Sequence, residues 1–509
     1  MKDRMTGDRQ PGNSHAAKTA ALWCGTFAVS LILYAATCQR GVDWGDSGLF
    51  QLRVQQGDYT GWHGLAQAHP LYIALAQIVA HVPVGGMAGR IGLFSGLGMA
   101  LALANLAVLA YRITQKRIAA FLIAAMLGTA QTPWLLSTFA EVYTWSVLGL
   151  TIELLLLLRL AQRPSRTALV LLALASGLGF SLHNLALLPL PVYLAVALTL
   201  VYRRRLPARV LPMAAAAYLL GAAPYLWLIA RQAIATGSIV AASGDALFGR
   251  FQSDVLSTRL RWQFLQWNLP FLAMNFISVL GPLVVVGMVS LRRLGTMLAW
   301  SIGAITVIHI IFLLRYSRPD MFTFSLPSLT MLAVVAAVGA AALMEKSALL
   351  RRLTIAGLAL SVAVQPLVYA AGPGLARSLE IQAKRTRQLP FRDDLRYWLV
   401  PWKHNEDSAA RFVEAAFEQA APDGIIVADS TPLHPLLFYR NEHPQYRGVE
   451  VLSIGAERLR SRLAAAGRRR IYVVTRGPSY TPGWLLSEAE FTAEGVLYRV
   501  RFRSKPAGG

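Results

Sequence analysis

Long apolar runs recur along most of this chain, and they constrain its fold more than any other feature. Each run holds about twenty residues, the length that an α-helix needs to cross the hydrocarbon core of a bilayer. Only 15% of the 509 residues are charged and 55% are hydrophobic, whereas a soluble chain carries charge on about a quarter of its residues. The sequence therefore predicts an α-helical polytopic membrane protein. Its predicted spans lie at about 19–38, 91–111, 118–137, 143–160, 167–183, 185–202, 210–230, 270–290, 296–314, 322–343 and 353–371.

One further apolar stretch, at about 70–83, raises the count to twelve if it crosses the membrane. It is short, and prolines bound it at both ends. If it lies along the outer surface instead, every dense basic cluster between spans faces the cytoplasm, as the positive-inside rule requires. We therefore expect about eleven transmembrane helices. The clusters are Arg112/Lys116/Arg117, Arg159/Arg163/Arg166, Arg203/Arg204/Arg205/Arg209, Arg292/Arg293 and Lys346/Arg351/Arg352.

This topology divides the chain by side of the membrane. Residues 1–18 form a cytoplasmic tail, and residues 19–371 form the transmembrane domain, whose first outer loop is 39–90. Residues 372–509 lie outside the cytoplasm; there, strand-like runs at 424–428 and 470–474 alternate with amphipathic patterns at 408–419 and 457–466. We expect a small C-terminal α/β domain. The predicted location is a bacterial inner membrane, with this domain in the periplasm.

The net charge of +23 is explained by these basic loops and by contact with anionic membrane lipids, so we predict no nucleic-acid partner. Cys24 and Cys38 lie in or at the end of the first apolar run and support neither a disulfide framework nor a metal site. The sequence holds no P-loop, no nucleotide-binding glycine fingerprint and no HExxH motif, which argues against an ATP-driven pump.

The densest group of polar residues lies in the first outer loop. Asp43 and Asp46 flank Trp44 and Gly45 just after the first span, and His69 follows before the surface stretch. A carboxylate desolvated at the bilayer edge can have a raised pKa and accept a proton from a hydroxyl, as a general base does. The alternative is a turn leaving the helix, with the tryptophan as an interfacial anchor.

Other candidates lie at the outer ends of later spans. Glu141 and Tyr143 begin one span, where an acid is also favoured by the helix dipole. His183 and Asn184 interrupt two apolar runs, as a simple reverse turn would.

Arg315, Arg318 and Asp320 join two spans on the outer side, where the inside rule predicts few arginines. Guanidinium groups bind phosphate oxygens in pairs, so a phosphate clamp is one interpretation. Lipid-headgroup contact or an ion pair with Asp320 is the other.

Several of these residues stand in motifs that resemble a known group, the domain family of unknown function related to protein O-mannosyltransferases, within the GT-C superfamily of polytopic glycosyltransferases. Two departures from its pattern are Leu49, where a glutamate is common, and Pro70, which runs directly into Leu71. The motifs are Trp44-Gly45-Asp46-Ser47-Gly48, His69-Pro70-Leu71-Tyr72, Arg90, Ala140-Glu141-Val142-Tyr143, Gly177-Leu178-Gly179 with His183-Asn184, and Asp320 before Phe322 and Pro327.

The resemblance implies a GT-C-like fold and a polyprenyl-phosphate-linked sugar as donor substrate, with the sugar presented outside the cytoplasm. It implies Asp46 as the base that activates the acceptor, with Asp43 second. The donor phosphate would face Arg318, with Arg315 behind it. The remaining substrate-binding candidates are His69, Glu141, Tyr143, His183, Asn184 and Asp320.

The acceptor class is left open between protein, lipid and glycan, and a divalent cation is a candidate cofactor. The alternative function is a transporter or flippase of a lipid-linked intermediate. Transporters place ionisable residues near mid-membrane, often within inverted repeats. Here Glu153 is the main ionisable residue inside a span, and no repeat is apparent.

Overall fold

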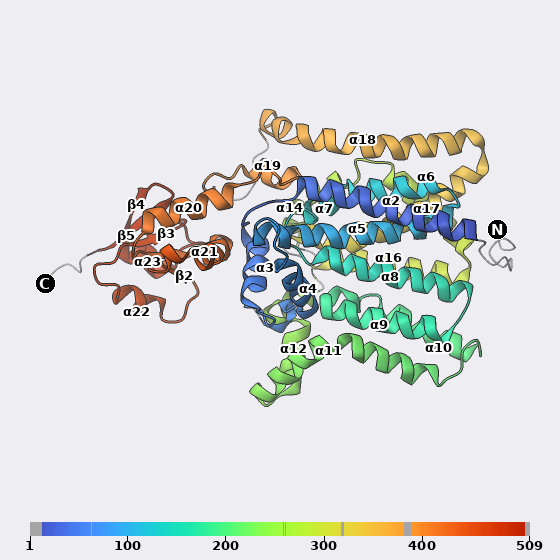
Figure 1. Ribbon diagram of the computed structural model, residues 1–509, viewed down its shortest axis with the longest axis horizontal. Coiled ribbons are helices and arrows are strands. Elements are labelled where there is room, and N and C mark those ends of the chain that lie inside the picture. The colour runs from blue at the N-terminus through green and yellow to red at the C-terminus, as the bar shows by residue number, and fades with distance from the viewer. Residues whose placement is uncertain are drawn as a thin grey trace.

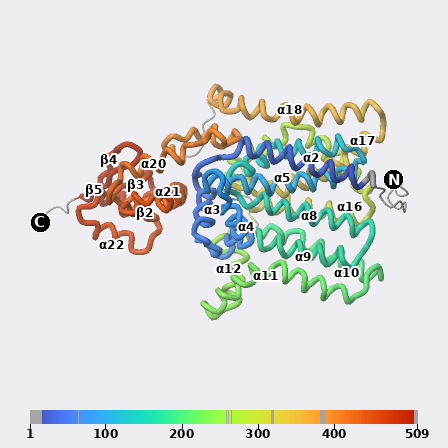
Figure 2. Tube along the Cα trace, in the orientation of Figure 1, coloured from blue at the N-terminus to red at the C-terminus, as the bar shows by residue number. Residues whose placement is uncertain are grey.

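The computed structural model describes residues 13–503 except 63, 258, 260, 317–319 and 381–387. A bundle of long helices forms one body, and a small α/β domain lies at one end of it (Figure 1). We call this end of the bundle the domain end. Helix α2 begins at the opposite end and runs toward the domain end, as the trace in Figure 2 shows.

Among the described residues, eight helices are long and apolar enough to cross a membrane, and three shorter apolar helices accompany them. The chain is therefore a multi-pass membrane protein, as predicted. The bundle helices are α2 (Asn13–Thr37), α5 (Met87–Thr114), α6 (Arg117–Gly128), α7 (Gln131–Leu136), α8 (Tyr143–Gln162), α9 (Arg166–Leu182), α10 (Leu190–Tyr202), α11 (Val210–Thr236), α14 (Trp262–Met274), α15 (Leu280–Ser290), α16 (Thr296–Arg315), α17 (Ser325–Lys346) and α18 (Ala348–Ser378).

Short helices connect these elements. The surface stretch predicted at 70–83 is helix α4, at the domain end beside α3 (Figure 1). The short helices are α3 (Gly45–Gln56), η1 (Leu65–Gln67), α4 (Pro70–Ala80), η2 (Asn184–Leu187), α12 (Ile239–Leu247), η3 (Gly249–Phe251), α13 (Gln252–Val255), η4 (Leu291–Leu294) and η5 (Met321–Phe324).

Two runs predicted as single spans, 118–137 and 270–290, each contain a break, so α6 is followed by α7 and α14 by α15. Backbone groups freed by a break inside the bundle must find partners within the protein. Here a residue at one break forms hydrogen bonds with a residue next to the other break. Asn275 accepts a hydrogen bond from the Thr132 backbone N–H at 2.8 Å and donates to Thr132 Oγ1 at 2.9 Å. The apolar runs predicted the helices, but they did not predict the breaks or this polar contact between the two distant segments.

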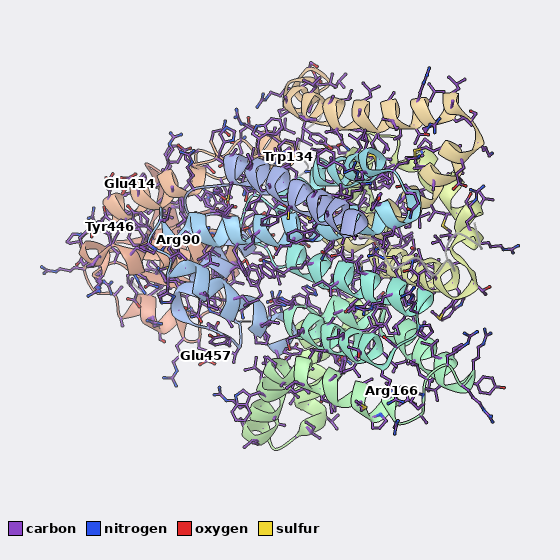
Figure 3. All side chains as sticks on the ribbon, turned by 45° about the vertical axis from the view of Figure 1, so that its right-hand side comes forward. Arg90, Trp134, Arg166, Glu414, Tyr446 and Glu457 are labelled. Carbon is purple, nitrogen blue, oxygen red and sulfur yellow. The ribbon has the colours of Figure 1, made fainter. Side chains whose placement is uncertain are left out.

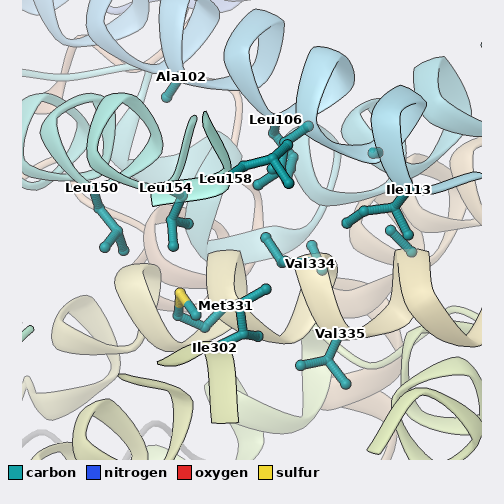
Figure 4. Close-up of a cluster of buried hydrophobic side chains, with 14 of the residues drawn as sticks. Ala102, Leu106, Ile113, Leu150, Leu154, Leu158, Ile302, Met331, Val334 and Val335 are labelled. Carbon is teal, nitrogen blue, oxygen red and sulfur yellow. The ribbon is translucent and has the colours of Figure 1, made fainter. Parts of the chain in front are cut away.

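The bundle core lies where α17 passes between its neighbours. Helix α17 is almost wholly buried, and its face of Met331, Val334 and Val335 packs toward side chains of α5, α8 and α16 (Figure 4). This all-round apolar helix is central, while the helices with one exposed apolar face, such as α18, are peripheral. The packed core gives the domain end a rigid base.

The basic clusters lie at the end of the bundle away from the small domain. They flank the helix termini at this end, from Arg112 at the end of α5 to Arg351 at the start of α18. Figure 3 labels Arg166 in the bundle, and Glu414 and Tyr446 in the small domain. The arrangement is the one expected when dense basic loops share one side of a membrane.

The C-terminal domain contains a five-stranded sheet in the order β2-β1-β3-β5-β4, parallel at β2-β1-β3 and antiparallel at β3-β5-β4. The α/β domain predicted from the sequence is confirmed, including the strands near 424–428 and 470–474. Its elements are α19 (Asp394–Leu399), α20 (Ser408–Ala420), β1 (Ile425–Ala428), α21 (Ser430–Glu442), η6 (Pro444–Tyr446), β2 (Glu450–Ser453), α22 (Leu459–Ala464), β3 (Ile471–Val473), α23 (Gly483–Glu488), β4 (Ala489–Glu494) and β5 (Leu497–Phe502).

Candidate active site

Asp46 lies in the first turn of α3 at the domain end, and it is exposed. The chain turns into this helix at Gly45, whose φ of 61° lies in the left-handed region that glycine adopts without strain. A carboxylate in the first helical turn is stabilised by the backbone N–H groups and the helix dipole. The Asp46 carboxyl group is therefore held at a helix terminus and is accessible from outside the protein.

Asp43, three residues earlier, is completely buried. Its Oδ1 accepts hydrogen bonds from the Trp44 backbone N–H at 2.7 Å and from the Tyr397 hydroxyl at 2.9 Å. Burial raises the pKa of Asp43 to about 6, while these two donors and the nearby Lys403 ammonium oppose the rise. The two loop aspartates thus occupy different environments: Asp46 faces outward, and Asp43 ties the loop to the C-terminal part of the chain.

Glu141 lies in the link between α7 and α8, where its backbone N–H donates to Ser95 Oγ at 2.8 Å. Burial raises the pKa of Glu141 well above its usual value, and the charges of Asp46, Asp320 and Asp43 raise it further. Carboxyl groups from three segments far apart in sequence are therefore close enough to influence one another. We refer to the predicted site residues Asp43, Asp46, Glu141 and Asp320 together as the acidic cluster, because the charges of the three aspartates act on Glu141.

His69 and His183 stack beside this cluster, with ring centroids 4.7 Å apart, and Tyr143 lies 5.2 Å from His183. His69 Nδ1 lies 2.9 Å from the carbonyl oxygen of Leu182, so this nitrogen carries the proton. His183 Nδ1 accepts from the Leu185 backbone N–H at 3.0 Å, so its proton is on Nε2.

Burial lowers the pKa of both rings, well below the usual value for His69 and to about 3 for His183. Both rings are neutral near pH 7. In each ring Nδ1 is bonded to the backbone, and Nε2 remains for a further hydrogen bond, as an acceptor in His69 and as a donor in His183.

The other predicted residues bond to other segments or lie outside the described residues. Asn184 donates to the carbonyl oxygen of Ala246 at 2.8 Å and so holds α12. Arg315 is exposed at the end of α16 and donates to the carbonyl oxygen of Ser257 at 2.7 Å. Arg318 lies outside the described residues.

Arg53, which the sequence analysis did not identify as a candidate, is a buried residue that holds the first outer loop together. Its guanidinium group is almost completely buried and donates to the carbonyl oxygens of Asp58, Gln67 and Ala68. Burial lowers its pKa to about 10, against the favourable charge of Asp58. Because Ala68 directly precedes His69, Arg53 fixes the backbone that presents this histidine. The available signal was an arginine set directly between the apolar residues Leu52 and Val54.

No group of three or more His, Cys, Asp or Glu side chains suited to hold a metal ion occurs among the described residues. A cavity of about 340 Å³ lies between the domain end of α18 and α19, lined by residues that include Arg377, Arg396 and Trp402. It contains none of the predicted site residues, so the candidate site is defined by the acidic cluster and the histidine pair.

Comparison with known proteins supports the fold and the resemblance seen in the sequence. Residues 66–206 match the family model described as "Protein O-mannosyl-transferase TMEM260 N-terminal domain", a match that covers less than a third of the chain.

Two solved structures share the fold over nearly the whole chain. ArnT from Cupriavidus metallidurans bound to undecaprenyl phosphate has a TM-score of 0.61 and 14% identity, with coverage of 94% of this chain and 98% of that one. Its apo state has a TM-score of 0.59, with the same identity and coverage. No curated protein matches the chain.

Proposed function

We propose that this protein is a glycosyltransferase that transfers a sugar from a polyprenyl-phosphate carrier to a protein, lipid or glycan outside the cytoplasm. The observation that carries this proposal is the exposed Asp46 carboxyl group, held in the first turn of α3, whose charge acts on the buried acid Glu141. The ArnT fold, seen with undecaprenyl phosphate in one of the similar structures, supports the donor class.

In the proposed reaction, Asp46 accepts the proton of the acceptor hydroxyl. The hydroxyl oxygen then forms a bond to the anomeric carbon of the sugar. The bond from that carbon to the phosphate oxygen breaks, and the polyprenyl phosphate leaves with the electron pair. Arg315, and Arg318 from the sequence, are proposed to stabilise the departing phosphate, since cationic donors aimed at developing charge lower the barrier.

The proposal places the domain end outside the cytoplasm and the N-terminus inside, in a bacterial inner membrane. The basic clusters at the opposite end of the bundle support this orientation. A reporter fused after residue 372 tests it: a reporter active only outside the cytoplasm should give signal, and one active only inside should not. The reverse result would contradict the proposed side of the site.

The test of transfer uses the full chain reconstituted with a radiolabelled polyprenyl-phosphate sugar and a membrane extract. The wild type should incorporate label into acceptor, and Asp46→Asn should reduce incorporation by at least about 10²-fold, the lower range for a general base. The matched control Asp423→Asn, at an exposed position of the C-terminal domain, should retain activity. Repeating the assay with EDTA tests for a divalent cation. Wild-type activity in Asp46→Asn would remove this residue from the mechanism.

The transport alternative has its strongest sequence support in Glu153, the acid inside α8. This side chain accepts a hydrogen bond from the Tyr193 hydroxyl at 2.9 Å and is buried in the bundle. The hydrogen bond links α8 to α10 within the bundle. A vesicle assay that detects movement of the labelled lipid across the bilayer without transfer of its sugar would favour the transport alternative.

A further inference from the structure

Three hydrogen bonds from the C-terminal part of the chain reach the segment just before Asp46. The Tyr397 hydroxyl donates to Asp43 Oδ1 at 2.9 Å. The Trp44 indole donates to Ser408 Oγ at 2.8 Å, and His434 Nδ1 lies 3.1 Å from the carbonyl oxygen of Gly45. Since a carbonyl only accepts, His434 donates from this nitrogen. Three consecutive residues, Asp43 to Gly45, are each bonded to a different C-terminal element.

Close packing accompanies these bonds. The ring of Trp44 lies 5.0 Å from that of Phe412 on α20. A Cβ built on Gly48 would lie 3.0 Å from Pro435 Cδ and 2.3 Å from the carbonyl oxygen of Asp43. Only glycine therefore allows α3 to approach α21 this closely.

Tyr397 is itself held in place by Lys403. Lys403 is buried, its Nζ donates to the carbonyl oxygen of Tyr397, and its ammonium lies 4.3 Å from the centre of the tyrosine ring. Tyr397 is 4% exposed and His434 is 2% exposed, and the bond between Tyr397 and Asp43 is fully buried. Hydrogen bonds in such an environment fix geometry more firmly than exposed ones.

We propose that the C-terminal domain acts as a positioning element of the active site: Tyr397 and His434 fix residues 43–45 and thereby orient Asp46. The inference rests on the proposed function of Asp46. A separate acceptor-binding module joined by a mobile linker would not need these buried contacts. A displacement of about 1 Å at a catalytic group can reduce the rate on the order of 10²-fold. Contacts that only fix the orientation of the loop can therefore have a large effect on the rate.

The first test compares single-group deletions in the full-length protein. Tyr397→Phe removes one hydroxyl, and His434→Phe removes the bond to Gly45 while retaining an aromatic ring against Trp62. Each should lower kcat by about 10- to 100-fold and leave KM for the polyprenyl-phosphate donor within about twofold. The matched control is Tyr472→Phe, a buried tyrosine whose hydroxyl bonds only within the C-terminal domain, to the Gln419 carbonyl oxygen at 3.5 Å; its kcat should stay at the wild-type value.

Unchanged kcat in both variants, or a raised KM with unchanged kcat, would overturn the positioning role. Absence of transfer by the wild type would instead overturn the proposed function, so the two failures are distinguishable.

The second test locks the contact. A Cβ built on Gly41 lies 3.5 Å from Ala410 Cβ, within the range that a disulfide requires. Gly41→Cys with Ala410→Cys, in a background with Cys24→Ser and Cys38→Ala, should form this disulfide on mild oxidation, and the locked protein should keep full activity. Each single-cysteine variant, oxidised in the same way, is the control. Failure of the disulfide to form, or activity that is lost on oxidation and restored by reduction, would contradict the inference.

Discussion

His69 and His183 stack with their ring planes inclined by only 20°, although one lies in the first outer loop before α4 and the other follows α9. Both are buried, and burial lowers both pKa values. The pair brings together two motifs that lie 114 residues apart in the sequence. Both rings are neutral; the remaining nitrogen of His69 is an acceptor and that of His183 is a donor.

This pair should make the protein less stable in acid. Below about pH 6.5 the unfolded chain protonates its histidines, whereas the folded pair stays neutral. Stability therefore falls as the pH drops from about 6.5 toward about 3, by up to about 1.4 kcal/mol per pH unit for each ring. His183→Asn should make the fall in melting temperature between pH 7 and pH 5 shallower than in the wild type. The exposed His404→Asn is the control; an equal slope in all three proteins would refute the prediction.

Asp43 should have the opposite pH dependence. Its folded pKa of about 6 lies above that of a free aspartate, so the folded state binds a proton that the unfolded state releases. Stability due to this group is highest below about pH 4 and is lost as the pH rises through about 6. Between pH 4 and pH 7, the free energy of unfolding of Asp43→Asn should rise relative to that of the wild type by up to about 3 kcal/mol. Thermal unfolding of both proteins at pH 4 and at pH 7 measures this change. A stability difference between variant and wild type that is the same at both pH values would contradict the raised pKa of Asp43.

Arg53→Lys should disorganise the first outer loop. A lysine ammonium cannot reproduce the forked geometry with which the guanidinium bonds several carbonyl groups. Each lost charged hydrogen bond costs about 1.5–3 kcal/mol, so we expect a lower melting temperature. Transfer activity should fall at least about tenfold because His69 is displaced. The control is Arg40→Lys, an exposed arginine of the same loop. Equal melting temperatures for the two variants would show that the buried bonds are replaceable.

Asn275→Ala should destabilise the bundle without touching the candidate site. It leaves the Thr132 backbone N–H without the amide oxygen that it binds, and an unsatisfied buried donor costs about 1–3 kcal/mol. Thermal unfolding in detergent should show a lower midpoint, while kcat measured well below that midpoint stays unchanged. The exposed Thr236→Ala provides the comparison. A midpoint equal to that of the wild type would mean that another group replaces the amide.

The long apolar helices and the C-terminal α/β domain could be predicted from the sequence because periodicity and hydropathy are local signals. Helix breaks were missed because Thr132 and Asn275 act through a contact between segments 143 residues apart. In the site, the motifs indicated Asp46, Glu141 and His183, but not their buried or exposed state, which depends on packing.

Tyr397, Lys403 and His434 carried no motif. They lie beyond the last of the motifs that carry the resemblance, and only the folded chain brings them to the first outer loop. Local patterns therefore indicated which residue types were chemically suggestive, and long-range packing decided which of them meet.

The bond between Asp43 and Tyr397 joins positions 354 residues apart, and this separation orders events during biosynthesis. The first loop leaves the ribosome long before the tyrosine that it binds, and the two can meet only after all the bundle helices, through α18, have been made. Products that end before Tyr397 therefore lack this bond, so the first outer loop reaches its final arrangement only when the C-terminal part of the chain joins it.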